Sequence, residues 1–146
     1  VLAKDVSPGK VFSGMHWEIT ATEAEHVQPY LDSLAYRIDS PEGSMVFTGD
    51  TQPCDSVVAL ASGADIMLCM CWDDQDIMDN NGEAPRQCGT RGAADMAQQA
   101  GVKTLGLVHI GPNLSQPGKK EKGIGDIKAA YEGDVIFADE LLVINV

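Results

Sequence analysis

The chain has 146 residues, of which 44% are hydrophobic and 22% charged, and its formal net charge is −12. This length suffices for one domain with its own hydrophobic core, so we treat residues 1–146 as a single soluble domain, cytoplasmic or periplasmic. No apolar run reaches the roughly 18 residues of a membrane span, which excludes a membrane protein of that kind. The acidity makes nucleic acid an unlikely main partner, because backbone phosphates are bound by clustered Lys and Arg.

Neither the basic residues nor the cysteines form a recognisable binding pattern in the sequence. The one basic cluster, "KKEK" at 119–122, is expected to be a solvated loop. Cys54, Cys69, Cys71 and Cys88 form no Cys-x-x-Cys pair, so neither a zinc pattern nor a disulfide framework is indicated. Cysteines on an apolar strand are usually small buried hydrophobes.

Strands dominate the first half of the chain, and strands alternate with helices in the second. The expected strands are two short ones within 10–26, a hairpin over 33–50, single strands at 64–72 and 102–110, and a terminal pair or hairpin over 134–146. The expected helices are 56–64, 90–101 and 123–133, with 73–89 as a long loop. This order predicts an α/β fold, with helices covering at least one face of a mixed sheet.

Three residues that can bind a metal stand at expected strand ends. His26 follows "ITATEAE", His109 follows "TLGLV", and Asp50 ends "MVFTGD". Taken singly, each has an ordinary explanation: Gly-Asp-Thr is a common turn, and a lone histidine is usually packed or solvated. Taken together they are the imidazole and carboxylate ligands of a catalytic zinc, and an Asp can bridge two ions. Sites in α/β folds commonly form at such strand ends.

These segments resemble the second half of a metallo-beta-lactamase-fold hydrolase, in the ribonuclease Z and arylsulfatase-like branch. The resemblance rests on "VFTGDTQPCD", the preceding His26, "SVVALASGADIMLCMCW" and "TLGLVHIGP", and it extends over about residues 10 to 145. It implies the α/β fold described above as one half of a four-layer αββα sandwich, with helices on the outer face of a mixed sheet.

The resemblance also implies roles for the three residues. His26 would bind one metal ion, His109 the other, and Asp50 would bridge both. The cofactors would be two divalent ions, with Zn2+ expected before Mn2+ or Fe. A hydroxide shared by the ions would attack an ester-type bond, and Asp50 and His109 would be catalytic.

The His-x-His-x-Asp-His motif of the family is absent, so each ion would keep only two protein ligands. The chain also begins without Met, inside what resembles a family strand. We therefore expect a complementary N-terminal half carrying that motif, in the same precursor or in another chain. Half a sandwich would expose its inner sheet face, so association with that half or with another copy, as a homo-oligomer, is expected.

The substrate is less well defined. Trp72, Asp73 and Asn81 are candidates for a substrate pocket, although Trp72 could equally cap the core and Asn81 could lie in a solvated loop. A small-molecule ester, lactone, sulfate or related compound is the first expectation. The alternatives are a ribonuclease Z-like phosphodiesterase and a non-catalytic scaffold module.

Overall fold

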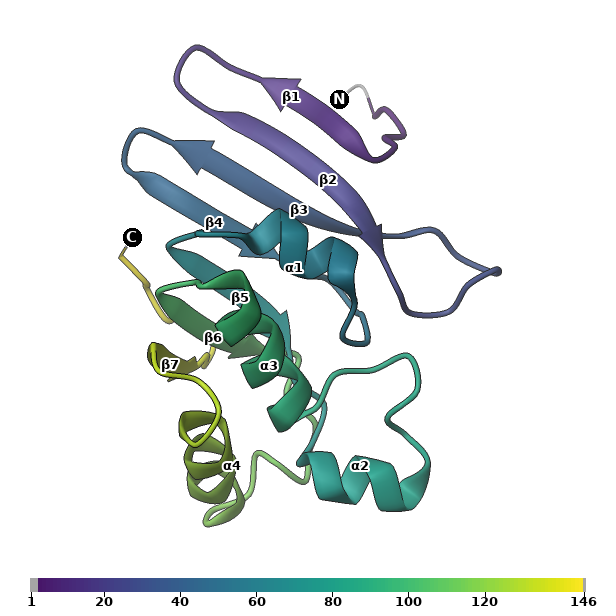
Figure 1. Cartoon of the computed structure of the whole chain (residues 1–146), viewed down its shortest axis with the longest axis vertical. Helices are drawn as coiled ribbons and strands as arrows, with labels where there is room; N and C mark the ends of the chain where they lie inside the picture. The colour runs from purple at the N-terminus through teal and green to yellow at the C-terminus, as the bar shows by residue number, and fades with distance from the viewer. Residues whose placement is uncertain (1–2, 146) are drawn as a thin grey trace.

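A computed structural model describes residues 3–145 and contains one seven-stranded sheet whose strand order follows the chain, β1 to β7 (Figure 1). The strands are β1 Gly9–Ser13, β2 Glu18–Ala24, β3 Ser33–Ser40, β4 Gly43–Phe47, β5 Ile66–Met70, β6 Thr104–Val108 and β7 Asp134–Phe137. Strands β1 to β4 pair antiparallel, whereas β4 to β7 pair parallel. Strands β2, β4, β5, β6 and β7 therefore run in one direction, and their carboxyl ends share one edge of the sheet.

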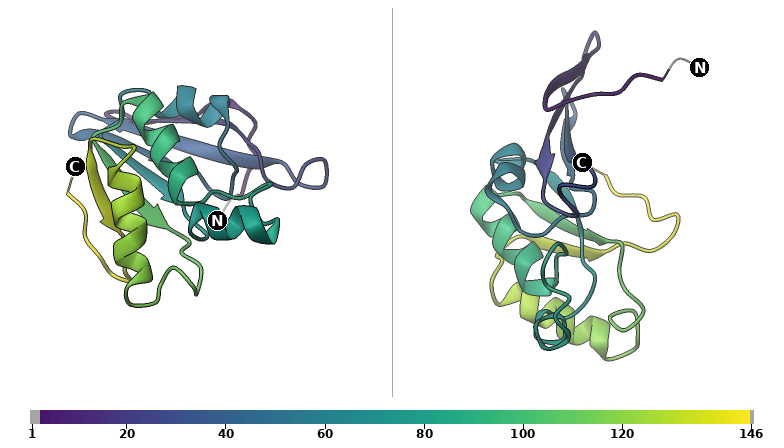
Figure 2. Two further views of the ribbon diagram at one scale, coloured as in Figure 1. Left: turned by 60° about the horizontal axis from the view of Figure 1, so that its bottom comes forward. Right: turned by 90° about the vertical axis from the view of Figure 1, so that its right-hand side faces the viewer.

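Three of the four helices, α1, α3 and α4, lie on one face of this sheet, and α2 packs against α3 (Figure 2). The helices are α1 Asp55–Ala61, α2 Gln75–Asn81, α3 Thr90–Ala100 and α4 Lys119–Lys128. The parallel crossovers place α1, α3 and α4 against the strands, where Ala-rich α3 packs closely through Ala93, Ala94 and Ala97. The predicted α/β class, with a mixed sheet and helices on one face, is confirmed.

Side chains alternate along the strands, and only one set joins the helix-side core. Val46, Met67, Leu105 and Leu107 are fully buried in that core. Much of the set that points to the opposite face is only half-buried, although Ala21, Ile66 and Met70 in it are buried, and Phe47 is 46% exposed. That set, which we call the open face, includes Ile19, Leu34, Tyr36, Ile38, Met45, Phe47 and Leu68. The open face is thus apolar without being packed against a second layer.

The end of the chain does not form the expected strand pair. Only β7 forms, and in the described residues after Phe137 the chain contains no strand. The segment instead crosses the open face, where Ile144 lies over Gly106 of β6 (Figure 2). Ile144 therefore covers part of the sheet, whereas Leu141 and Val143 of the same segment remain largely exposed.

Two segments expected to be loops are helical. Helix α2 lies within 73–89; the Asp74 carboxylate accepts from the Asp76 amide at its start, and Gly82 ends it at φ 71°. Met78 is its one buried residue, so no periodic apolar pattern marks it. The basic cluster begins α4, where the Gly118 amide donates to Glu121 Oε2 (2.6 Å).

The Asp65 carboxylate joins the amino ends of three parallel strands and predicts a pH dependence. It accepts from Ser44 N (2.8 Å) and Ser44 Oγ (2.9 Å), and it pairs with Lys103 Nζ (2.5 Å). Its hydrogen bond with Lys103, followed by those with Ser44, lowers the pKa of Asp65 from 3.8 to about 2. A folded-state pKa below the unfolded value adds stability above the unfolded pKa that is lost as pH falls through the folded one.

We expect Asp65→Asn to be less stable than the parent near neutral pH, with the difference shrinking as pH falls from about 4 toward 2. Urea midpoints of both proteins at about pH 6, 4 and 2.5 measure this. A difference that stays constant across the series would mean that the charge of Asp65 contributes nothing.

Candidate metal centre

The three residues predicted to bind metal lie on one edge of the sheet. His26 comes two residues after β2, Asp50 three residues after β4, and His109 directly after β6. Because these strands run in the same direction, all three residues lie at their shared carboxyl edge. Residues 24 to 83 positions apart in the sequence are thereby brought together.

Asp50 lies between the two imidazoles. Its Oδ2 is 3.9 Å from His26 Nε2, and its Oδ1 is 3.4 Å from His109 Nε2. The side chains of His26, Asp50 and His109 are 23%, 43% and 50% exposed, so solvent reaches the cluster. Each carboxylate oxygen thus faces a different histidine, which is the arrangement a bridging ligand needs.

The Gly-Asp-Thr segment places Asp50 by a tight local geometry. Gly49 has φ +60°, and a Cβ there would lie 3.2 Å from the Leu34 carbonyl oxygen. Thr48 is fully buried, donates to Gly49 O (2.8 Å), and accepts from Met70 N (3.3 Å). The strand therefore ends on a glycine because only glycine fits both the conformation and the space.

His26 is fixed to the segment that follows Asp50. The Glu25 amide donates to Thr51 Oγ1 (3.1 Å), and the Gln52 amide donates to the Glu25 carbonyl (2.7 Å). At the ring, Nδ1 lies 2.6 Å from the Arg86 carbonyl oxygen. A carbonyl can only accept, so Nδ1 carries a proton, and Nε2 is the ring nitrogen that faces Asp50.

His109 adopts a backbone conformation that is rare outside glycine, with φ +51°. Strain of this kind concentrates at functional sites, where surrounding contacts maintain it. Two such contacts are present: the His109 ring meets the edge of Trp72 (centroids 5.8 Å apart, 86° between planes), and Gly111 N donates to Trp72 O (2.9 Å).

The donor types fit divalent metal, although the number of donors is small. Tetrahedral zinc with bonds of roughly 2.1 Å separates neighbouring donor atoms by about 3.4 Å. The distance of 3.4 Å from His109 Nε2 to Asp50 Oδ1 matches this value. The distance of 3.9 Å from His26 Nε2 to Asp50 Oδ2 is slightly longer, so a small movement of the side chains would bring it to this value. Within residues 3–145 no group of three or more His, Cys, Asp or Glu is placed to hold one ion. These three residues therefore supply too few ligands to complete a catalytic metal site by themselves.

The residues predicted to line a substrate pocket have different environments. Trp72 borders the cluster through its contact with His109. Asp73 is only 6% exposed and accepts from Asn113 Nδ2 (2.8 Å), so it holds the segment after His109. Asn81 is exposed at the end of α2, and in the described part of the chain its side chain has no hydrogen bond to the cluster.

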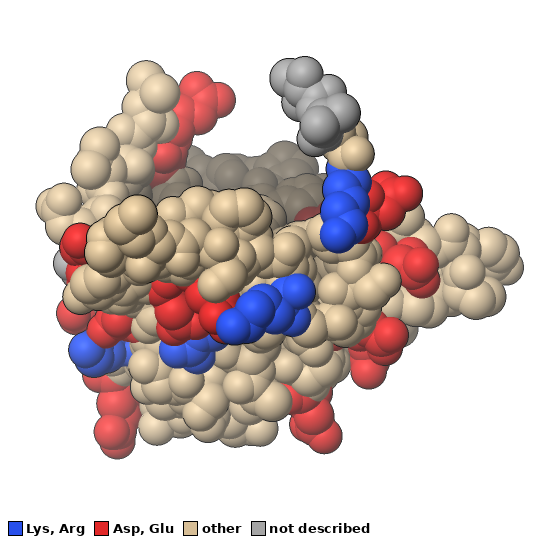
Figure 3. Space-filling model, turned by 90° about the horizontal axis from the view of Figure 1, so that it is seen from above, with Lys and Arg blue, Asp and Glu red and all other residues tan. Residues whose placement is uncertain are grey.

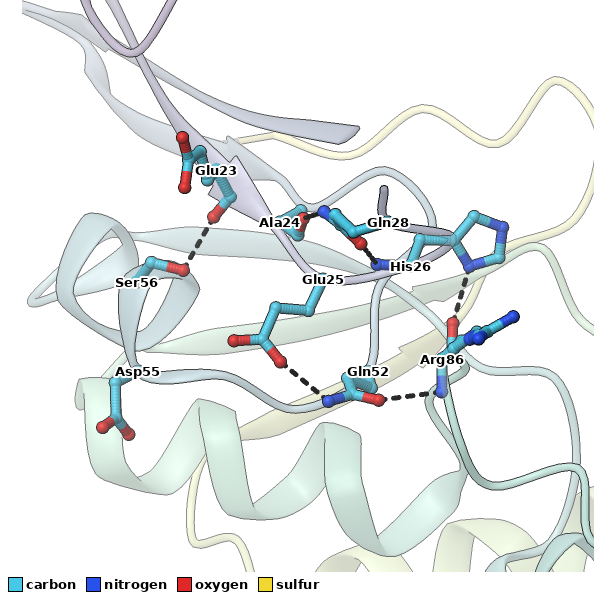
Figure 4. A pocket seen from close by; sticks show the side chains of 9 residues that line it. All are labelled: Glu23, Ala24, Glu25, His26, Gln28, Gln52, Asp55, Ser56 and Arg86. Atoms are coloured by element: carbon cyan, nitrogen blue, oxygen red, sulfur yellow. Dashed lines mark hydrogen bonds between the residues drawn. The ribbon is translucent and has the colours of Figure 1, made fainter. Parts of the chain in front are cut away.

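Cavities lie on both sides of the cluster. One of about 600 Å³ is polar and lies beside His26, with Glu25, Gln52 and Arg86 among its lining residues (Figure 4). Another of about 530 Å³ lies beside His109 and is lined by Ser115, Lys120 and Phe137 together with the start of the C-terminal segment. Both are in the size range of small-molecule sites.

Sequence reasoning did not identify Gln52, Arg86 or Gly111. Gln52 follows the Gly-Asp-Thr segment directly, which could have drawn attention to it. Arg86 acts through its backbone, which no residue pattern reveals. Gly111 lies within the segment "TLGLVHIGP", but its close approach to Trp72 is visible only in the folded structure.

Comparison with known proteins identifies the family. The sequence model of a family described as a beta-lactamase superfamily domain matches residues 3–110. The chain belongs to this superfamily. The structure of the metallo-beta-lactamase fold protein YhfI from Bacillus subtilis is similar with a TM-score of 0.75 at 23% identity, over 92% of this chain and 52% of that one. The predicted fold, half of a metallo-beta-lactamase sandwich, is confirmed.

Two relatives are similar in sequence. Ribonuclease Z of Haloarcula marismortui is 29% identical over 136 residues, which are 92% of this chain and 42% of that protein. An uncharacterized protein of Mycobacterium leprae is 36% identical over 135 residues, which are 86% of this chain and 45% of that protein. The chain thus spans about half the length of the superfamily members it matches.

No helix among residues 3–145 is both long enough and apolar enough to cross a membrane.

Proposed function

We propose that this chain is the half of a metal-dependent hydrolase that supplies His26, Asp50 and His109 to a binuclear centre, with zinc expected before manganese or iron. The observation that carries the proposal is the Asp50 carboxylate, whose two oxygens face two different imidazoles at 3.9 and 3.4 Å.

Each residue has a defined part in this function. Ions held here would supply a Lewis acid and a water of lowered pKa at neutral pH. Asp50 would offer one carboxylate oxygen to each ion, and its negative charge would offset positive charge at the centre. The Arg86 carbonyl fixes the His26 ring, and Trp72 limits how far the His109 ring can turn.

A small molecule is the proposed substrate, with an ester, lactone or sulfate as the bond class. The cavity beside His109 combines apolar Phe137 and Ile110 with polar Ser115, and its volume of about 530 Å³ suits a ligand of modest size. The charge of −12 opposes binding of a long polyanion. In the face shown in Figure 3, Lys and Arg occur as small groups among acidic side chains.

A ribonuclease Z-like phosphodiesterase is the second candidate, favoured by the Haloarcula marismortui relative. It would need a basic surface supplied by another segment. A scaffold without catalysis is the third candidate.

Metal analysis and a substrate screen separate these candidates. The chain, assembled with a segment carrying His-x-His-x-Asp-His, is expected to hold stoichiometric divalent metal. If no metal is retained, both enzyme functions lose their basis. Nitrophenyl esters, sulfates and phosphodiesters are then compared, and cleavage of RNA-like phosphodiesters alone would exclude the small-molecule proposal.

We propose that the open face receives the complementary half. Ile19, Leu34, Tyr36 and Ile38 are half-buried there, and the chain spans about half of its relatives. A sheet whose second face is apolar normally buries it against another layer. That layer would also bring the ligands that the two ions lack.

The same face predicts self-association of the chain when it is produced alone. Phe47, the last residue of the middle strand β4, is 46% exposed on this face. We expect Phe47→Asp to weaken association at least about tenfold, because burial of a Phe contributes about 1.5–3 kcal/mol. Sedimentation equilibrium measures this, and Ala59→Asp, at an exposed position of α1 on the helix side, is the control. Equal effects of the two substitutions would place the interface elsewhere.

A further inference from the structure

A chain of hydrogen bonds leads from Gln52 to the His26 ring (Figure 4). Gln52 Oε1 accepts from the Arg86 amide (2.8 Å), and Gln52 Nε2 donates to Glu25 Oε2 (2.7 Å). The Arg86 carbonyl in turn accepts from His26 Nδ1 (2.6 Å). One side chain thus joins the segment after Asp50, the end of β2, and the loop after α2.

Arg86 needs such support. Its φ is +73°, a conformation that costs a residue with a side chain more than it costs glycine. Its side chain is exposed, so packing does not hold the residue in place. The two hydrogen bonds to its own amide and carbonyl are what fix this peptide next to His26.

The chemistry at position 52 requires an amide. One end of the side chain must accept from a backbone N–H and the other must donate to a carboxylate. A Glu there could accept from Arg86 but would oppose the charge of Glu25, and an apolar side chain could do neither.

We propose that Gln52 is a positioning residue: by holding the Arg86 peptide, it keeps His26 in the tautomer that is protonated at Nδ1, with Nε2 free to bind metal. The benefit of this tautomer, a free Nε2 for metal, rests on the proposed function. The effect of Gln52 on the tautomer can be tested without it. Hydrogen-bonded partners of this kind commonly orient metal-binding histidines.

The tautomer can be measured on the metal-free chain. The ring 15N shifts of His26 in ¹⁵N-histidine-labelled protein are recorded at about pH 8.5, where an ordinary imidazole is neutral. The His26→Gln variant assigns the signals. We expect the parent to show a protonated Nδ1, and Gln52→Met to reduce the ratio of the two tautomers about tenfold toward Nε2–H, as loss of one hydrogen bond allows.

A charge swap provides the matched control. Gln52→Glu alone should disturb the tautomer, and Glu25→Gln combined with Gln52→Glu should restore it, because the amide and carboxylate exchange places. Circular dichroism verifies folding, and the swapped pair remains informative if Gln52→Met does not fold. An unchanged tautomer ratio in Gln52→Met or Gln52→Glu, or a disturbed ratio that the swap leaves unrestored, overturns the proposal.

The outcome is independent of metal binding. If the assembled protein holds no metal while Gln52 still governs the tautomer, the proposed function fails and the positioning role stands. If metal binds but the tautomer ratio of His26 does not depend on Gln52, the positioning role fails and the proposed function stands.

Discussion

Asp50→Ala is expected to lower turnover of the assembled protein by roughly a thousandfold, equivalent to about 4 kcal/mol of transition-state stabilisation. The reason is that both oxygens of one carboxylate are used, one toward His26 and the other toward His109. In the binuclear centre that we propose, loss of Asp50 would remove a ligand from both ions at once, whereas loss of either histidine would affect one ion. Turnover and metal content, measured on the same preparation, test this.

The fold should tolerate the change. Asp50 is 43% exposed, and the turn around it is fixed by Gly49 and Thr48 rather than by its own side chain. We expect a loss of stability below about 1 kcal/mol. Asp95→Ala, at an exposed position of α3, removes the same charge away from the site and should leave turnover unchanged. A variant at Asp50 that melts earlier but keeps its turnover would show that the residue only closes a turn.

The approach of His26, Asp50 and His109 could be foreseen because it depends on strand order. Each residue follows a strand closely, and strands that run in the same direction have their carboxyl ends at one edge of the sheet. The metal-binding roles of these residues remain predictions from the family resemblance, and the distances between them could not be predicted. His109 also adopts the left-handed backbone conformation, which the surrounding sequence "LVHIG" does not predict.

Other features depended on tertiary contacts that residue types do not encode. The Arg86 carbonyl meets His26 across 60 positions, and any residue at 86 would offer the same oxygen. Helix α2 has one buried anchor, Met78, so its polar composition suggested a loop. The apolar C-terminal segment has the composition of a strand, but Ile144 packs onto the open face instead.

Gly111→Ala is the second substitution with a large expected effect. A Cβ at Gly111 would lie 2.3 Å from the Trp72 carbonyl oxygen, which is backbone and cannot rotate away. The Trp72 peptide is also held by its own amide, which donates to Cys88 O (2.8 Å). The added methyl must therefore displace the segment that carries His109, at a cost of about 1–3 kcal/mol.

The displacement should lower turnover as well as stability. His109 stands two residues before Gly111, and the ring edge of Trp72 limits its rotation, so a shift of this segment changes the distance of 3.4 Å to Asp50. We expect turnover to fall by more than the loss of folded protein explains, as judged from urea unfolding and rates at one temperature.

Gly125→Ala is the matched control for this change. Gly125 lies within α4, and outside the backbone of its own helix no heavy atom of the described chain is within 4 Å of the position of a Cβ, so the same added methyl meets open space. It should raise stability by about 0.4–1 kcal/mol, because it reduces the freedom of the unfolded chain. Opposite signs at the two glycines would show that contact with Trp72, rather than the methyl itself, couples the end of β5 to His109. If Gly111→Ala is instead as stable and active as the parent, the Trp72 peptide is free to move, and His109 must be held at Asp50 by other means.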